Sequence, residues 1–175
     1  MSGGSIIVLA ILVFAGVTIF KGVRIVPQGY KWIVQRLGKY HTTLTPGLNF
    51  VIPYVDEVAY KVTTKDIVMD IPSQEVITRD NAVLLMNAMA YINITTPEKA
   101  VYGIENYTWA IQNLVQTSLR SIVGEMDLDD ALSSRDHIKA KLKAAISDDI
   151  SDWGITLKTV EIQDIQPSST MQSAM

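Results

Sequence analysis

The chain has 175 residues, with 15 Lys and Arg against 18 Asp and Glu, so its formal net charge is -3. This balance provides no basic field that would bind nucleic acid. The sequence contains no cysteine, which excludes disulfides, thiolate metal sites and cysteine nucleophiles.

The first twenty residues carry no charged side chain. As a helix they would cover about 30 Å, the thickness of a bilayer's hydrocarbon core. Apolar side chains fall on every face of that helix, so no polar side could turn towards water. The sequence therefore predicts a transmembrane anchor over residues 1–24. The side chains expected to contact lipid are Ile6, Ile7, Val8, Leu9, Ile11, Leu12, Val13, Phe14, Val17, Ile19 and Phe20.

The charges that flank this segment predict how it inserts. A signal peptide begins with a basic region, but no Lys or Arg precedes the apolar stretch, so we expect an uncleaved anchor. The basic residues that follow the stretch are Lys21, Arg24, Lys31, Arg36 and Lys39. The positive-inside tendency then places the N-terminus outside the cell inner (plasma) membrane and the main body in the cytoplasm.

Residues 25–94 are expected to form a β-rich subdomain. Apolar residues alternate over 30–37, 58–62 and 67–71, as is typical of strands. The polar residues 38–43 are expected to form a turn, and Pro72 to end the strand that precedes it. Arg79–Asp80–Asn81 contains residue types that favour turns, and it lies between two further stretches with a β pattern. This arrangement predicts a long hairpin.

A short apolar stretch within this subdomain has two interpretations. It is too short to span a membrane. It is either the buried edge of a sheet or an interfacial loop that lies beside the anchor at headgroup level. The residues of the interfacial-loop interpretation are Leu48, Phe50, Val51, Ile52 and Tyr54.

Residues 95–166 are expected to form an α/β subdomain. Thr96 and Asn106 are good N-cap residues for a short helix up to about Tyr102 and for a longer helix ending at Gly124. A single turn is expected near 127–130, a helix from Ser133 or Ser134 to about residue 153, and a returning strand over 155–165. Residues 167–175 have the pattern of the start of a further helix, so we expect the natural protein to continue.

The pattern of chemically competent residues does not indicate an enzyme. His41 and His137 lack a second histidine at ligand spacing. The acidic group around Asp129 lacks the glycine turn and terminal glutamate of a calcium loop, and no nucleophile or phosphate-loop motif is present. We expect no catalytic residue, no metal site and no cofactor.

An ordered set of motifs resembles the SPFH, or band 7, domain of stomatins, prohibitins and flotillins, and in particular its slipin branch. That branch includes bacterial QmcA-type membrane proteins and mitochondrial stomatin-like paraslipins. The segments that carry the resemblance are Val26–Tyr30, Arg36–Tyr40, Pro46–Leu48, Ile52–Pro53, Asp70–Thr78, Asp80–Asn81, Gln116–Ser121, Trp153–Ile155 and Val160–Ile165.

The resemblance implies an α+β protein with an N-terminal transmembrane helix and a two-part SPFH domain. It further implies a homo-oligomeric ring or cage that organises a membrane microdomain, contacts membrane lipids and modulates membrane proteases or other partners. It also implies an NfeD-type membrane protein as a partner, since slipins are often paired with one. The side-to-side contacts are expected on the polar faces of helices 107–123 and 134–152.

Other functions remain open from the residues alone. One is an anchored lipid-binding module that uses the stretch from Leu48 to Tyr54. Another is a non-catalytic subunit of a membrane protease complex.

Overall fold

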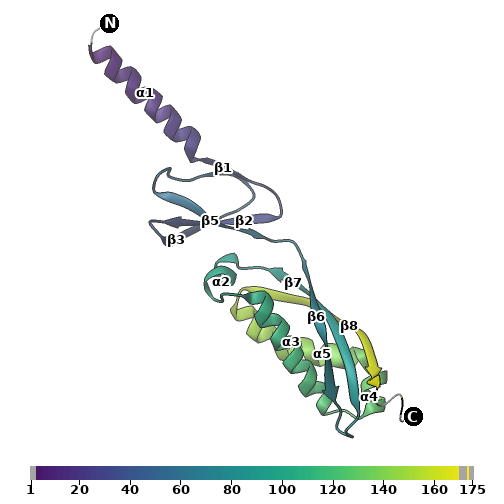
Figure 1. Cartoon of the computed structure of the whole chain (residues 1–175). Helices are drawn as coiled ribbons and strands as arrows, with labels where there is room; N and C mark the ends of the chain where they lie inside the picture. Colours follow the sequence, from purple (N-terminus) through teal and green to yellow (C-terminus); the bar gives the residue numbers. More distant parts are fainter. Residues whose placement is uncertain (1–2, 170–172, 174–175) are drawn as a thin grey trace. The chain divides into compact units, whose positions relative to one another are not determined.

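The computed structural model describes residues 3–169 and 173, and it divides the chain after Thr64 into two compact units. Both units are coloured by sequence in Figure 1. Unit 1 contains one helix and five strands, and unit 2 contains four helices and three strands. The α+β class and the apolar N-terminal helix predicted from the sequence are confirmed.

Unit 1 consists of a long helix followed by two small antiparallel sheets. Strand β1 pairs with β4, while β2 lies between β3 and β5. Its small core is formed by Val26, Val34 and Leu44, with Trp32, Val51 and Val58 packed against them. The elements are α1 (Gly3–Gly22), β1 (Val23–Val26), β2 (Tyr30–Arg36), β3 (Lys39–Leu44), β4 (Gly47–Phe50) and β5 (Asp56–Thr63).

Unit 2 is a three-stranded antiparallel sheet packed against helices, with β7 in the middle of the sheet. Every second residue of β7 is buried, because α3 and α5 pack against the neighbouring strands of this sheet. The elements are β6 (Ile67–Ile77), β7 (Val83–Ile94), α2 (Pro97–Tyr102), α3 (Tyr107–Gly124), α4 (Leu128–Ser133), α5 (Arg135–Asp152) and β8 (Ile155–Pro167).

Three details differ from the sequence expectation. Residues expected to form a turn before Thr43 form strand β3, which pairs with β2. Strand β6 continues past Pro72, where the pairing register shifts between Ile71 and Gln74. Pro72 has no partner in this irregular stretch of an edge strand, which is a position where proline is tolerated. The sequence places the β6–β7 hairpin in the β-rich subdomain 25–94. In the structure the hairpin belongs to unit 2, where β7 pairs with β8.

The helix starts were predicted with mixed success. The Asn106 side chain accepts a hydrogen bond from the Trp109 backbone N–H at 3.0 Å, as expected of an N-cap. Thr96 occupies the N-cap position of α2 but makes no side-chain cap bond. The helical start expected over 167–175 lies mainly outside the described residues.

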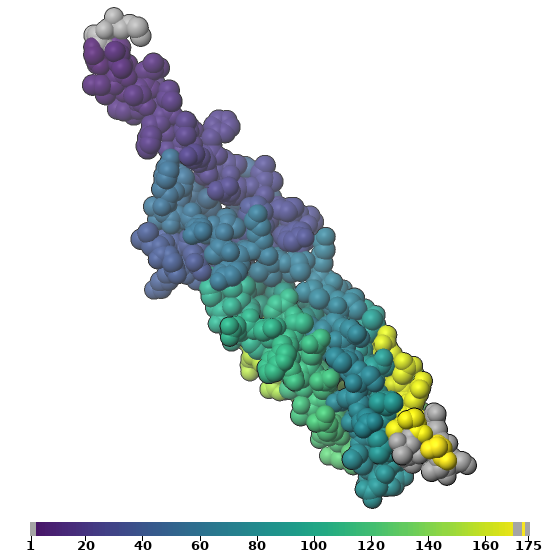
Figure 2. Space-filling model, in the orientation of Figure 1, coloured from purple at the N-terminus to yellow at the C-terminus, as the bar shows by residue number. Residues whose placement is uncertain are grey.

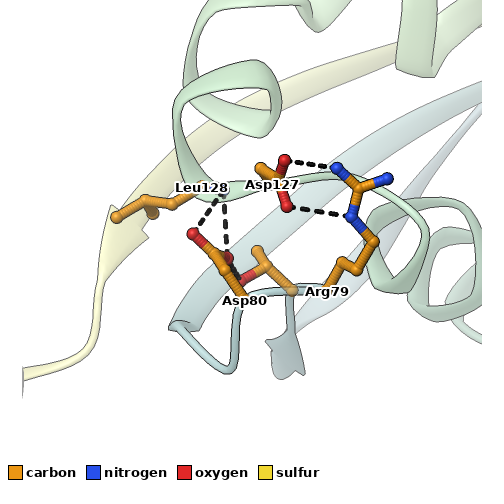
Figure 3. Close-up of polar contacts among 5 residues, drawn as sticks. Arg79, Asp80, Asp127 and Leu128 are labelled. Carbon is orange, nitrogen blue, oxygen red and sulfur yellow. Dashed lines mark hydrogen bonds and ion pairs between the residues drawn. The ribbon is translucent and has the colours of Figure 1, made fainter.

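The tip of the β6–β7 hairpin is attached to the start of α4, as Figure 3 shows. Arg79 forms a two-pronged ion pair with Asp127. The Asp80 carboxylate accepts a hydrogen bond from the Leu128 backbone N–H at 3.2 Å and one from the Thr78 hydroxyl. The Thr78 bond is the main reason why the pKa of Asp80 lies below its usual range. One acidic side chain thus joins a β-turn to a helix N-terminus.

Long side chains from the helices bind backbone carbonyls of both edge strands. Such contacts leave an edge strand fewer free groups for pairing with another chain. On β6 they join Gln112 to Asp70 and Gln116 to Pro72, and on β8 they join Lys143 to Lys158 and Arg135 to Gln163.

Candidate membrane interface

Helix α1 is exposed along its apolar part and has the dimensions of a membrane span. Its 20 residues are long and apolar enough to cross a bilayer, and none of its apolar window is buried. All eleven apolar side chains that the sequence assigned to lipid contact are exposed, and Figure 2 shows the visible side of this helix, in purple, uncovered. In the described part of the chain, protein therefore does not cover the apolar side chains of α1. This is expected of a helix that contacts lipid.

The end of α1 is fastened to the segment that follows β4. The Val51 backbone N–H donates a hydrogen bond to the Gly22 carbonyl at 2.8 Å. A Cβ at position 22 would lie 2.7 Å from the Val51 carbonyl oxygen, closer than real Cβ contacts. Only glycine fits at this close approach of two backbones.

The short ribbon of β1 and β4 presents an apolar face. Val23 pairs with Phe50, and Ile25 pairs with Leu48. Side chains alternate between the faces of a strand, so these two pairs share one face, whereas Val26 lies on the other face and is buried in the core of unit 1. Three of these four side chains, Ile25, Leu48 and Phe50, are exposed, and Val23 is half-buried.

We call the exposed apolar side chains around the end of α1 the junction surface. Its members are between 53% and 85% exposed, which is unusual for so many large apolar residues close together. They are Phe20, Ile25, Leu48, Phe50, Ile52 and Tyr54.

The two interpretations of the stretch from Leu48 to Tyr54 can now be compared with the structure. The stretch begins as a strand, but the strand is not buried: four of the five proposed interfacial residues point outwards and only Val51 packs into the core. Sequence reasoning missed Ile25, whose alternation with the buried Val26 was the available signal. The interfacial role of the stretch stays a prediction.

A partly buried ion pair holds the loop after β4 in place. Arg36 donates to both carboxylate oxygens of Asp56, at 2.6 and 3.0 Å, and the Ile52 backbone N–H donates to the same carboxylate at 2.9 Å. The Asp56 side chain is only 3% exposed. The Arg36 hydrogen bonds are the largest cause of a pKa of about 2 for Asp56, so this carboxylate remains ionised and paired at neutral pH.

Tyr54 is held in an unusual conformation at the edge of the junction surface. Its φ of +72° lies in the left-handed region, which residues other than glycine and asparagine rarely adopt. The Lys21 ammonium lies 5.5 Å from the centroid of its ring, within cation–π range. Strained residues of this kind cluster at functional sites, and an interfacial tyrosine beside a lysine suits the headgroup region.

The structure assembles no other chemically competent cluster in the part it describes. Among residues 3–169 and 173, no group of three His, Asp or Glu side chains is placed to hold a metal ion. His41 on β3 and His137 on α5 are both exposed and far apart in the sequence. Of the acidic group around Asp129, Asp127 pairs with Arg79 in the hairpin contact described above.

These features define a membrane-associated α+β protein with one apolar N-terminal helix. Residues 24–175 match the model of the SPFH domain / Band 7 family. The chain belongs to this family of membrane-associated scaffolds, as the motif resemblance implied.

Several relatives support the assignment. The chain is 37% identical over 150 residues to human stomatin-like protein 2, mitochondrial, covering 86% of this chain and 42% of that protein. It is 36% identical over 153 residues to the Caenorhabditis elegans stomatin-like protein stl-1, covering 87% and 47%. An uncharacterized protein of Mycobacterium tuberculosis is 34% identical over 172 residues, covering 98% and 45%. The chain thus spans less than half the length of these relatives.

The Arg36–Asp56 pair predicts an acid-sensitive unit 1. The pKa of Asp56 in the folded state lies below that of an unfolded aspartate, about 4, so the pair stabilises unit 1 above that pH and loses its effect as the pH falls towards 2. We expect Asp56→Asn to lower the free energy of unfolding at neutral pH by about 1–3 kcal/mol. The stability of the variant should then no longer fall as the pH drops from about 4 towards 2. Trp32 fluorescence in a W109F/W153F background would report on unit 1 alone, because the other two tryptophans lie in unit 2.

The exposed neighbour Glu57 provides the matched control, since Glu57→Gln removes the same charge from the same strand. An Asp56→Asn protein that unfolds like Glu57→Gln over the whole pH range would contradict the role of the pair.

The junction surface predicts which residues lie at the membrane. The chain has no cysteine, so single spin labels can be introduced without any background substitution. In vesicles, labels at Leu48→Cys and Phe50→Cys should collide more often with oxygen and less often with a water-soluble nickel complex than labels at Lys39→Cys and His41→Cys, which lie on β3 of the same unit. Equal accessibility of the two sets would show that the junction surface stays in water.

Proposed function

We propose that this protein is a membrane-anchored SPFH scaffold that self-associates, organises a membrane microdomain and modulates membrane proteases or other membrane partners. The observation that carries the proposal is the exposed 20-residue span joined directly to the apolar junction surface of unit 1. Family membership supports the scaffold role. In this proposal unit 1 rests against lipid, and the rest of the chain is available for contacts with other proteins.

Self-association would strengthen membrane attachment without a tight individual site. Anchors linked in one assembly act together, so that the whole binds far more strongly than each part. A closed ring requires head-to-tail contacts whose rotation closes. The edge strands of unit 2 have carbonyls already bound by α3 and α5 side chains, which disfavours assembly by strand addition. We therefore place the contacts on the exposed polar faces of α3 and α5.

The proposed orientation puts the N-terminus outside the inner (plasma) membrane and the SPFH domain in the cytoplasm. The cations Lys21 and Arg24, directly after the span, favour it. Single cysteines test it: a membrane-impermeant maleimide should label Gly4→Cys in intact cells and Lys39→Cys only after permeabilisation. The reverse pattern would overturn the orientation while leaving the anchor itself in place.

Assembly is tested by particle mass in mild detergent. We expect large particles rather than monomers or dimers, and we expect charge reversal on the exposed face of α5, Lys141→Glu or Asp148→Lys, to reduce the particle mass. Lys39→Glu on β3 is the control, because it changes an exposed charge away from these helices. Particles that are large but insensitive to both α5 changes would move the contacts elsewhere.

Discrete monomers or dimers of the unmodified chain would instead favour the second candidate, an anchored lipid-binding module. The observation that favours this candidate is again the junction surface. A non-catalytic role in a membrane protease complex, or pairing with an NfeD-type partner, would be tested by co-purification with a named partner after cross-linking in membranes.

A further inference from the structure

A hollow of about 410 Å³ lies beside the end of α1, on the side of Lys21 and Arg24. Its walls come from the last residues of the helix, from β1 and from the loop after β4. The lining side chains that matter here are Lys21, Arg24, Tyr54 and Asp56. The hollow thus lies at the level where a membrane span ends and lipid headgroups begin.

The charge of this hollow is positive and uncompensated. Within residues 3–169 and 173, neither Lys21 nor Arg24 forms an ion pair with a carboxylate. Asp56 also lines the hollow, but both of its oxygens are engaged by Arg36 and by the Ile52 N–H. Its negative charge is therefore already neutralised, and an anion entering the hollow would meet two cations that no described carboxylate pairs with.

A second hollow, of about 310 Å³, adjoins the first along Val51 and Pro53. Apolar side chains dominate its walls, including Ile19, Phe50 and Ile52. Because the two hollows share Val51 and Pro53 as lining residues, a molecule that occupied both would need an anionic part and an apolar part. A glycerophospholipid combines these two parts, whereas a free phosphate ion has only the first.

We propose that this junction binds one anionic glycerophospholipid, with the headgroup phosphate between Lys21 and Arg24 and an acyl chain along the apolar hollow. The inference rests on the membrane anchoring in the proposed function and is independent of self-association. Charge-assisted hydrogen bonds from ammonium and guanidinium groups to phosphate are short and strong. The Tyr54 ring, already beside the Lys21 ammonium, would form the outer wall of the headgroup site.

This site differs from the general attraction of basic residues to an anionic membrane. That attraction depends on the number of cations near the surface and is screened by salt. A formed site depends instead on two particular cations and on the cavity between them. Two variants with the same net charge therefore distinguish the two cases.

The test is native mass spectrometry of the whole chain in mild detergent, titrated with phosphatidylglycerol. We expect one tightly retained lipid per chain, with phosphatidylcholine retained more weakly. The double change Lys21→Gln with Arg24→Gln should weaken phosphatidylglycerol binding about tenfold or more, since it removes both charged donors. Lys31→Gln with Lys39→Gln removes the same charge from β2 and β3 and should bind like the unmodified chain. The exchange Lys21→Arg with Arg24→Lys should retain binding, which controls for a damaged fold.

Three results would overturn the proposal. Equal weakening by the two double Gln variants would leave only diffuse attraction. Equal retention of phosphatidylglycerol and phosphatidylcholine would remove the anionic specificity. Displacement of phosphatidylglycerol by inorganic phosphate or glycerol 3-phosphate at similar concentration would make the site one for a free phosphate rather than a lipid. Flotation of each variant with phosphatidylcholine vesicles reports anchoring separately, so a loss of lipid specificity with intact flotation leaves the anchored scaffold standing.

Discussion

The junction between the apolar helix and the sheets of unit 1 depends on one backbone contact, between the last residue of α1 and the segment after β4. The hydrogen bond from Val51 to the Gly22 carbonyl, and the absence of room for a Cβ at Gly22, bring two main chains together. Gly16, in the middle of the same helix, has nothing within 4 Å of an added Cβ. Packing therefore requires only one of these two glycines, and that one joins the span to the β1–β4 ribbon.

The charges around this contact follow from the same arrangement. Holding the loop after β4 against the helix end places the Asp56 carboxylate at 3% exposure, where an unpaired charge would be costly. Arg36 reaches it from the end of β2, and the Ile52 N–H completes its shell. Because this pair satisfies the acidic group, Lys21 and Arg24 remain available to an external anion. The Arg36–Asp56 pair and the two cations without a carboxylate partner, Lys21 and Arg24, thus both depend on the position of this loop.

Sequence periodicity predicted the elements that local information determines. The span, the hairpin turn at Asp80 and the Asn106 cap each depend on residues within a few positions of one another. The pairing of Ile25 with Leu48 and of Arg36 with Asp56 joins residues more than fifteen positions apart, and no local pattern encodes such pairs. Strand β3 was missed because its side chains are mostly polar and exposed, so it shows no clean apolar alternation. Val51 was grouped with its apolar neighbours, although it follows the end of β4 and packs against the core of unit 1.

In the proposed arrangement, the junction surface would orient the protein on the membrane rather than attach it. A 20-residue apolar span already inserts strongly, since each large side chain contributes about 1.5–3 kcal/mol when it leaves water. A single helix still leaves the attached unit free to rotate about the helix axis. A second apolar contact, off that axis and on the rigid β1–β4 ribbon, would restrict this rotation. If this rotation is restricted before subunits meet, less rotational entropy is lost when they associate. In the proposed scaffold, the membrane would therefore prepare each subunit for assembly, and a lipid bound at the junction would reinforce that effect.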